Sequence, residues 1–171
     1  GSSDANALFD DQHTYCYACL TYVKGDGEAQ AEQKAKKDFN FAGGSVSSMP
    51  ERGITRDTCQ YYGVQVSPEG AHHFYPYTNS EGAIIASKIR SVGDKTFSIS
   101  GDWKSSVLFG QSLFPKGGKT VTIHEGELDA LAGFQMAGSK YANVSIRNGA
   151  QSALKDVKQA YEWLTTFDEI Y

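Results

Sequence analysis

The 171 residues suffice for one domain of ordinary size, or for one domain with a small appendage, and a content of 40% hydrophobic and 21% charged residues predicts a packed core rather than disorder. The formal net charge of −4 argues against a protein that coats nucleic acid through bulk positive charge, although a local basic groove stays compatible with it. The sequence contains no apolar run of the roughly 18 residues that a membrane span needs and no signal peptide, and its three cysteines favour a reduced, intracellular protein.

Residues 1–23 predict a small β-rich segment, in which threonine and tyrosine residues surround Cys16 and Cys19. The Cys-x-x-Cys spacing is that of one half of a structural zinc ribbon, and zinc needs four ligands. His13 is the only other candidate ligand nearby. On spacing alone, two unpaired cysteines beside tyrosines are therefore the default interpretation.

Residues 24–50 are polar, glycine-rich and only weakly periodic. They lack the apolar stripe of a packed helix, which predicts a linker. The next segment, 51–63, predicts a short helix that is capped by Thr55 and ended by Gly63.

Between residues 63 and 101 the hydrophobic residues alternate with a period of two, and turn signals such as Pro-Glu-Gly at 68–70 and Gly-Asp at 93–94 interrupt them. This pattern predicts an antiparallel β-meander. Residues 102–118 are irregular, with a helical turn expected around 105–109.

The meander contains a basic strand. Lys88 and Arg90 are two apart and therefore face the same side of the predicted strand, and Lys95 lies across a short turn. Three cations on one sheet face could bind the phosphates of a nucleoside triphosphate or of a nucleic-acid template. A solvated strand face is the commoner origin of such a pattern, so the residues alone leave both interpretations open.

From Lys119 onward the pattern alternates between strand and helix. Strands are predicted at 119–123 and 141–146, and a helix at 127–137 is ended by Gly138. Such alternation predicts a parallel sheet with right-handed crossovers.

A second helix is predicted within residues 150–167. Its expected buried face consists of four residues at helical spacing, Leu154, Val157, Tyr161 and Leu164. The turn before it, 147–150, could hold an anion on its backbone amides or could be a plain turn. Residues 168–171 begin like a third strand.

Three carboxylates, Glu125, Glu127 and Asp129, stand where the first of these strands gives way to its helix. Ligands of open parallel sheets bind at the carboxyl ends of the strands, where Glu125 lies. If the helix begins near Gly126, Glu125 and Asp129 lie about 5–6 Å apart on one face and Glu127 points elsewhere. Two such oxygen ligands suit Mg²⁺. The helix dipole also favours acids in a first turn, and by itself explains them equally well.

The stretch VTIHEGELDALAGFQ (121–135) resembles the first motif of the Toprim fold, an apolar strand followed by Glu-Gly-x-x-Asp at the start of a helix. Primases, type IA and type II topoisomerases and some nucleases share this fold, and NVSIRNGAQSALK (143–155) resembles the segment that follows in the primase branch. The resemblance implies that Glu125 is the motif's general acid/base or ligand of Mg²⁺ (or Mn²⁺), and that Asp129 is its supporting acid. A later Asp-x-Asp pair that completes the family's metal site is expected beyond the last residue, so the metal site is expected to be incomplete.

Three further stretches resemble the N-terminal half of the RNA polymerase domain in phage-type primase-helicases, which are relatives of the mitochondrial replicative helicase. They are RGITRDTCQYYG (52–63), SEGAIIASKIR (80–90) and DKTFSISGDWKSSVLFG (94–110). With the Toprim motif, the likeness runs through nearly the whole chain in the family's order. It implies that Lys88, Arg90 and Lys95 contact nucleotide phosphates or template, with Arg52 as a weaker candidate for the same groove.

The same family begins with a four-cysteine zinc module, whose first Cys-x-x-Cys pair precedes a turn similar to the opening GSSDANALFDD (1–11). The resemblance therefore implies that Cys16 and Cys19 are zinc ligands of the parent protein, with the first pair upstream of Gly1. With two ligands of four, this chain is expected to bind Zn²⁺ poorly. In the family, the module reads the template trinucleotide at which primers start.

The predicted fold is α+β or α/β in four parts. These are half of a zinc ribbon (1–23), a linker (24–50), an antiparallel, basic, β-rich subdomain (51–118) and a truncated Toprim-like parallel βαβα subdomain (119–171).

The resemblance implies a fragment of a phage DNA primase, which makes short RNA primers from ribonucleoside triphosphates on single-stranded DNA with Mg²⁺. A fused helicase domain that forms a hexameric ring and a replicative DNA polymerase are the parent's expected partners, in the cytoplasm of the infected bacterium and away from membranes. The fragment alone is expected to make few primers or none. The alternatives are a fragment of a Toprim-type topoisomerase or nuclease, and a non-catalytic module that binds template or a partner protein.

Overall fold

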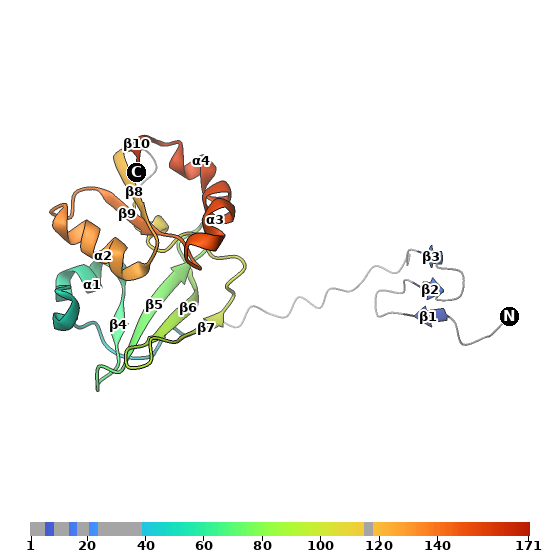
Figure 1. Ribbon diagram of the computed structural model, residues 1–171, viewed down its shortest axis with the longest axis horizontal. Coiled ribbons are helices and arrows are strands. Elements are labelled where there is room, and N and C mark those ends of the chain that lie inside the picture. Colours follow the sequence, from blue (N-terminus) through green and yellow to red (C-terminus); the bar gives the residue numbers. More distant parts are fainter. Residues whose placement is uncertain (1–5, 9–13, 17–20, 24–38, 115–117) are drawn as a thin grey trace. The chain divides into compact units, whose positions relative to one another are not determined.

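The computed structural model describes residues 6–8, 14–16, 21–23, 39–114 and 118–171. The chain divides into two compact units, Gly1–Lys37 and Asp38–Tyr171. In the first unit an antiparallel sheet consists, in chain order, of β1 (Asn6–Leu8), β2 (Thr14–Cys16) and β3 (Thr21–Val23) (Figure 1). A search of the described residues for a helix long and apolar enough to cross a membrane finds none.

The second unit begins with an antiparallel sheet whose strands follow one another in chain order. They are β4 (Gln65–Val66), β5 (His72–Thr78), β6 (Ile84–Ser91) and β7 (Phe97–Gly101). The predicted meander is therefore confirmed. The long central pair runs from His72 opposite Ser91 to Thr78 opposite Ile84, with a shift in register after Tyr77. Strand β7 forms the edge, and all five of its residues are exposed.

Helix α1 (Arg56–Tyr62) follows a 3₁₀ helix at Pro50–Arg52, and both of its predicted caps are confirmed. The Thr55 hydroxyl accepts a hydrogen bond of 3.3 Å from the backbone N–H of Thr58, which satisfies a donor that the first turn leaves unpaired. Gly63 ends the helix with a φ of +70°, a conformation that a residue without Cβ adopts freely.

The residues before α1 pack onto this sheet. Ser45 pairs with Val66 in an isolated antiparallel bridge, and Met49 is 1% exposed within the hydrophobic core. The second unit therefore includes residues from the end of the segment 24–50, which composition describes as a linker.

The helical turn expected around 105–109 is wrong. Phe109 instead pairs with Ser145 in an isolated β-bridge, and the 3₁₀ helix comes later, at Gln111–Leu113. Gly110 stands between them with a φ of +79°, which turns the chain away from the bridge.

Three parallel strands form the second sheet of this unit, in the order β10-β8-β9. They are β8 (Gly118–His124), β9 (Ala142–Ser145) and β10 (Phe167–Ile170). Helix α2 (Glu127–Met136) follows β8, whereas α3 (Ala153–Gln159) and α4 (Tyr161–Leu164) follow β9. The predicted fold class, an antiparallel sheet followed by a parallel strand-and-helix alternation, is confirmed.

The single helix predicted within 150–167 is wrong, because the helix breaks at Ala160, whose φ of −90° and ψ of 2° are not helical. Leu154 and Tyr161, expected in the core, are 70% and 64% exposed. Leu164 is buried and Val157 is partly buried, as expected.

Two buried residues replace those expected on this face. Asp156 of α3 is 2% exposed and binds Arg147. The periodicity of apolar residues cannot predict such a buried polar contact. After the break, α4 turns Trp163 toward the core, where it is 7% exposed.

Two hydrophobic cores hold the second unit together. The first joins the antiparallel sheet to α1 and α2, chiefly through aromatic residues: Tyr62, Tyr75, Tyr77, Phe109 and Phe134. The second joins the parallel strands to the helices that follow β9, through Val121, Val144, Trp163 and Leu164. Figure 1 shows α1 and α2 on one side of the parallel strands and α3 and α4 on the other. The first core thereby fixes the N-terminus of α2 against β5 and β6.

Candidate active site

A cavity of about 840 Å³ opens at the carboxyl end of β8. Its lining comes from four places in the chain: the first turn of α2, strands β6 and β7, the 3₁₀ helix before α1, and the turn after β9. Five of the six residues predicted for catalysis or phosphate binding line it together, namely Glu125, Asp129, Lys88, Arg90 and Arg52. Lys95 lies in the turn between β6 and β7, with a φ of +58°, and does not line this cavity.

Glu125 and Asp129 present exposed carboxylates to the cavity. Neither side chain forms a hydrogen bond or an ion pair with another residue in the described part of the chain. A Cβ atom on Gly149 would lie 3.8 Å from Glu125 Oε1, and one on Gly126 would lie 3.3 Å from Asp129 Oδ2, so glycines leave space around both groups.

These two carboxylates fit Mg²⁺. Within residues 39–114 and 118–171, no three His, Cys, Asp or Glu side chains gather closely enough to hold a metal ion without other ligands. Mg²⁺ does not require such a group, because it commonly takes one or two carboxylates and keeps water or phosphate oxygens at its other positions.

Glu127, the third acid of the motif, has a different environment. It is 4% exposed, and its Oε1 accepts hydrogen bonds from the Tyr77 hydroxyl at 2.5 Å and from Lys88 Nζ at 2.8 Å. Burial raises the pKa of Tyr77 well above its usual range, and the neighbouring Glu127 carboxylate raises it further, so the phenol stays protonated and donates.

Lys88 is predicted to bind phosphates, but its ammonium group already has protein partners. Besides Glu127, it donates a 2.9 Å hydrogen bond to the carbonyl of Arg147 and lies 4.9 Å from the centroid of the Phe97 ring. Its side chain is only 12% exposed. Arg90 and Arg52 differ, because their guanidinium groups form no hydrogen bond or ion pair with other described residues. They are the cavity's available cations.

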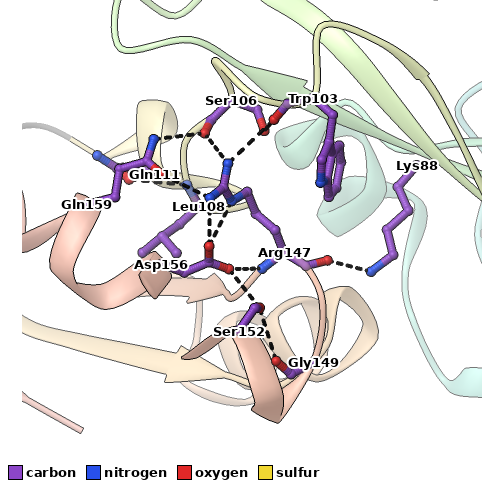
Figure 2. A network of polar contacts seen from close by, with 10 residues as sticks. All are labelled: Lys88, Trp103, Ser106, Leu108, Gln111, Arg147, Gly149, Ser152, Asp156 and Gln159. Carbon is purple, nitrogen blue, oxygen red and sulfur yellow. Dashed lines mark hydrogen bonds and ion pairs between the residues drawn. The ribbon is translucent and has the colours of Figure 1, made fainter. Parts of the chain in front are cut away.

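Arg147 and Asp156 form a buried ion pair behind the turn after β9, as Figure 2 shows. Asp156 accepts two hydrogen bonds from the guanidinium group, at 2.7 and 3.0 Å, and one from the backbone N–H of Arg147 at 2.8 Å. A further guanidinium nitrogen donates to the carbonyl of Ser106 at 2.9 Å. The turn at 147–150 therefore does bind an anion through a backbone amide, and the anion is a carboxylate of the same chain.

This pair orders the turn that carries Asn148 and Gly149 into the cavity wall. The sequence analysis did not predict this pair. The sequence offers two signals for it, a charged residue after an apolar strand and an acid nine residues later. Charges at such a separation carry no periodicity that would predict their contact.

The predicted zinc ligands belong to the first unit. Cys19 lies outside the described residues, and of Cys16 only its place at the end of β2 is described. Their role as zinc ligands stays a prediction.

Comparison with known proteins extends this reading. No protein-family model matches the chain. Over 185 residues it is 31% identical to the DNA helicase/primase of Enterobacteria phage T3, in an alignment that covers 99% of this chain and 32% of that protein. The chain thus spans about a third of the length of this curated relative.

The crystal structure of the primase fragment of the bacteriophage T7 primase-helicase is 33% identical and superimposes with a TM-score of 0.71, over 99% of this chain and 74% of that one. The chain belongs to the phage primase-helicase family, in its primase part. A second T7 structure, 34% identical with a TM-score of 0.69, covers 99% of this chain and 73% of that one. It shows the lagging-strand DNA polymerase with the primase domains of two gp4 subunits bound to an RNA/DNA hybrid and dTTP. The family predicted from sequence motifs is confirmed, and the primase-helicase fold accounts for the succession of the two sheets.

Proposed function

We propose that this chain is the catalytic primase part of a phage primase-helicase, and that it joins ribonucleoside triphosphates into short RNA primers on single-stranded DNA. One observation carries the proposal. Two unpaired carboxylates, Glu125 and Asp129, share a cavity with two unpaired guanidinium groups, Arg52 and Arg90. The chain is 33% identical to the T7 primase fragment over 99% of its own length.

In this proposal Glu125 and Asp129, which line the cavity, would hold Mg²⁺ or Mn²⁺, or Glu125 would instead accept the proton of the attacking 3′-hydroxyl. When bound, the metal supplies positive charge to the triphosphate oxygens, on which phosphoryl-transfer catalysis chiefly depends. Arg90 and Arg52 bind and orient the phosphates. Lys88 acts from behind them by holding Glu127, and thereby the start of α2, in place.

The remaining partners follow from the family. We assign single-stranded DNA template and ribonucleoside triphosphates as ligands, and a helicase ring and a replicative DNA polymerase as protein partners, in the cytoplasm of an infected bacterium. Lys95 is assigned to template outside the cavity, because it lies in the exposed β6–β7 turn. Cys16 and Cys19 are assigned to Zn²⁺ on their spacing and on family membership.

The test uses the complete parent protein with single-stranded DNA, labelled ribonucleotides and Mg²⁺. We expect Glu125→Gln and Asp129→Asn each to lower primer synthesis by about 100-fold or more, because each removes a charge that acts at the reacting phosphate. The melting temperature should stay within about 2 °C of the wild type, since both side chains are exposed and make no contact that folding needs.

Glu81→Gln serves as the matched control, because Glu81 is an exposed acid outside this cavity. Undiminished primer synthesis by Glu125→Gln would refute the proposal. DNA cleavage without primer synthesis by the wild-type parent would favour the Toprim nucleases, and DNA binding without either activity would favour a template-binding module.

A further inference from the structure

Strand β7 carries two large apolar side chains into the candidate active site. Phe97 is 51% exposed and Ile99 is 47% exposed, and both line the cavity that contains Glu125 and Asp129. They are two apart on one strand, so they share a face of the sheet. Large exposed apolar groups gathered in the wall of a polar cavity indicate that the bound ligand has an apolar surface of its own.

Cations lie directly beside this apolar pair. In the register of the sheet, Phe97 is opposite Arg90 and Ile99 is opposite Lys88. The Phe97 ring centroid lies 5.6 Å from Arg90 Cζ and 4.9 Å from Lys88 Nζ. These contacts orient the ring, because a cation is attracted to the face of an aromatic ring. About half of the Phe97 residue stays exposed.

A ligand that satisfies all parts of this cavity must be flat and apolar at one end and anionic at the other. A nucleotide has this composition, since its base stacks on aromatic rings and its phosphates pair with guanidinium groups. The volume of about 840 Å³ falls within the range of small-molecule sites, roughly 300–1,000 Å³. An acidic peptide would leave Phe97 and Ile99 uncovered, and an alkyl chain would leave Arg52 and Arg90 unpaired.

We propose that Phe97 and Ile99 form the stacking surface for a nucleobase, whose phosphates point toward Arg52 and Arg90. This inference rests on the proposed function and deepens it, because it assigns the base-binding wall of the same cavity. Stacking on an aromatic face tolerates every base, so this wall supplies affinity and orientation rather than sequence readout. The base belongs either to the incoming ribonucleotide or to the template strand, and the experiment separates the two.

The direct test is fluorescence of Phe97→Trp in the complete parent protein. The native Trp103 and Trp163 are partly or fully buried, so the new indole is the exposed one among the described tryptophans. We expect quenching on titration with a ribonucleoside triphosphate, with an oligodeoxynucleotide, or with both. Inorganic tripolyphosphate and an abasic oligodeoxynucleotide of equal charge should leave the emission unchanged. Quenching by the triphosphate alone assigns the site to the incoming nucleotide, and quenching by the oligodeoxynucleotide alone assigns it to the template.

Tyr161→Trp is the matched control, because Tyr161 is 64% exposed and lies outside the cavity. Its emission should not respond to any of the four ligands. Equal responses of the two variants, or no response of Phe97→Trp to either base-bearing ligand, would overturn the stacking proposal.

Affinity provides an independent readout. Phe97→Ala should weaken binding of the base-bearing ligand by about 5- to 150-fold, the usual effect of removing one stacked aromatic residue, and leave the abasic ligand unaffected. Phe97→Tyr keeps an aromatic ring and should bind the base-bearing ligand like the wild type, whereas Phe97→Leu has no ring and should bind it as weakly as Phe97→Ala. Glu125→Gln keeps the stacking wall, so it should lose primer synthesis and keep the wild-type ratio of affinities for base-bearing and abasic ligands. Equal loss of base-bearing and abasic ligands by Phe97→Ala would refute stacking without touching the proposed function.

Discussion

The ammonium group of Lys88 joins the connections that follow two strands of the parallel sheet, the first turn of α2 after β8 and the turn after β9. It binds Glu127 in the first turn after β8 and the carbonyl of Arg147 in the turn after β9. Because Glu127 lies between Glu125 and Asp129 in the sequence, its contact with Lys88 helps to fix both exposed carboxylates relative to β6. In the proposed function, Lys88 therefore contributes chiefly by positioning other groups, and Arg52 and Arg90 meet the phosphates.

The buried ion pair between Lys88 and Glu127 predicts a large loss of stability when only one partner is removed. Lys88→Met should lower the free energy of unfolding by about 3–5 kcal/mol, because it leaves the buried Glu127 carboxylate without its counter-charge. Urea unfolding of the complete chain measures the change. Lys140→Met is the control, since Lys140 is exposed and should have almost no effect. A loss below about 1 kcal/mol for Lys88→Met would show that the pair is solvated rather than buried.

At the scale of elements, helix α3 is held by charge as much as by apolar contact. Asp156 joins it to Arg147 at the end of β9, and Arg147 in turn reaches the carbonyl of Ser106 in the connection between the two sheets. One ion pair thus links a helix, a parallel strand and the loop that follows the antiparallel sheet (Figure 2).

This pair predicts a pH dependence. Burial on its own raises the pKa of Asp156, but hydrogen bonds from the side chain and backbone of Arg147 outweigh it, so the pKa in the folded state lies below the usual 3.8. A carboxyl group with a lowered pKa contributes its full stabilisation above pH 3.8 and loses it as the pH falls through the folded-state value.

Asp156→Asn should therefore destabilise the protein by about 3 kcal/mol at neutral pH, and the difference from the wild type should narrow below pH 3.8. Urea unfolding of both proteins over this pH range measures it. Asp168→Asn, at an exposed position, supplies the comparison and should change little at any pH. A difference that stayed constant with pH would contradict the assigned ionisation.

The same elements show what sequence patterns can and cannot predict. The predicted bounds of β8 and α2 agree with the structure within one residue, because a β-branched apolar strand and a glycine at each end of the helix are local signals. The burial of Asp156 depends on its ion pair with Arg147, nine residues earlier, and no local rule connects these two residues. Likewise, the spacing of the motif predicts Glu125 and Asp129 as site residues. It does not predict the pairing of Lys88 with Glu127, because these residues are 39 apart and only the fold places them in contact.

At the scale of the whole molecule, the antiparallel sheet of the second unit shares a core with α2, the helix that follows the strand β8 of the parallel sheet. Tyr77 of β5, Tyr62 of α1 and Phe134 of α2 belong to one cluster, although the first two precede the parallel sheet in the chain. The walls of the cavity are therefore fixed relative to each other by aromatic packing beneath it.

Shared packing predicts that residues 39–171 unfold in a single transition. Trp103 packs against the first core and Trp163 lies in the second, so Trp103→Phe and Trp163→Phe leave one fluorescent probe in each. In each variant, we expect the urea midpoint measured by fluorescence to equal the midpoint measured by far-UV circular dichroism. Fluorescence midpoints that departed from the circular dichroism curve in either variant would show that the cores unfold independently.

The contrast between Lys88 and the two free arginines has a consequence for ionic strength. Dissolved ions screen charges that face water, and they scarcely reach a pair whose partners are 12% and 5% exposed. Added salt should thus release a polyanion from Arg52 and Arg90 while the Lys88–Glu127 contact persists. The cavity would therefore lose its anionic ligand at salt concentrations that leave the Lys88–Glu127 ion pair intact.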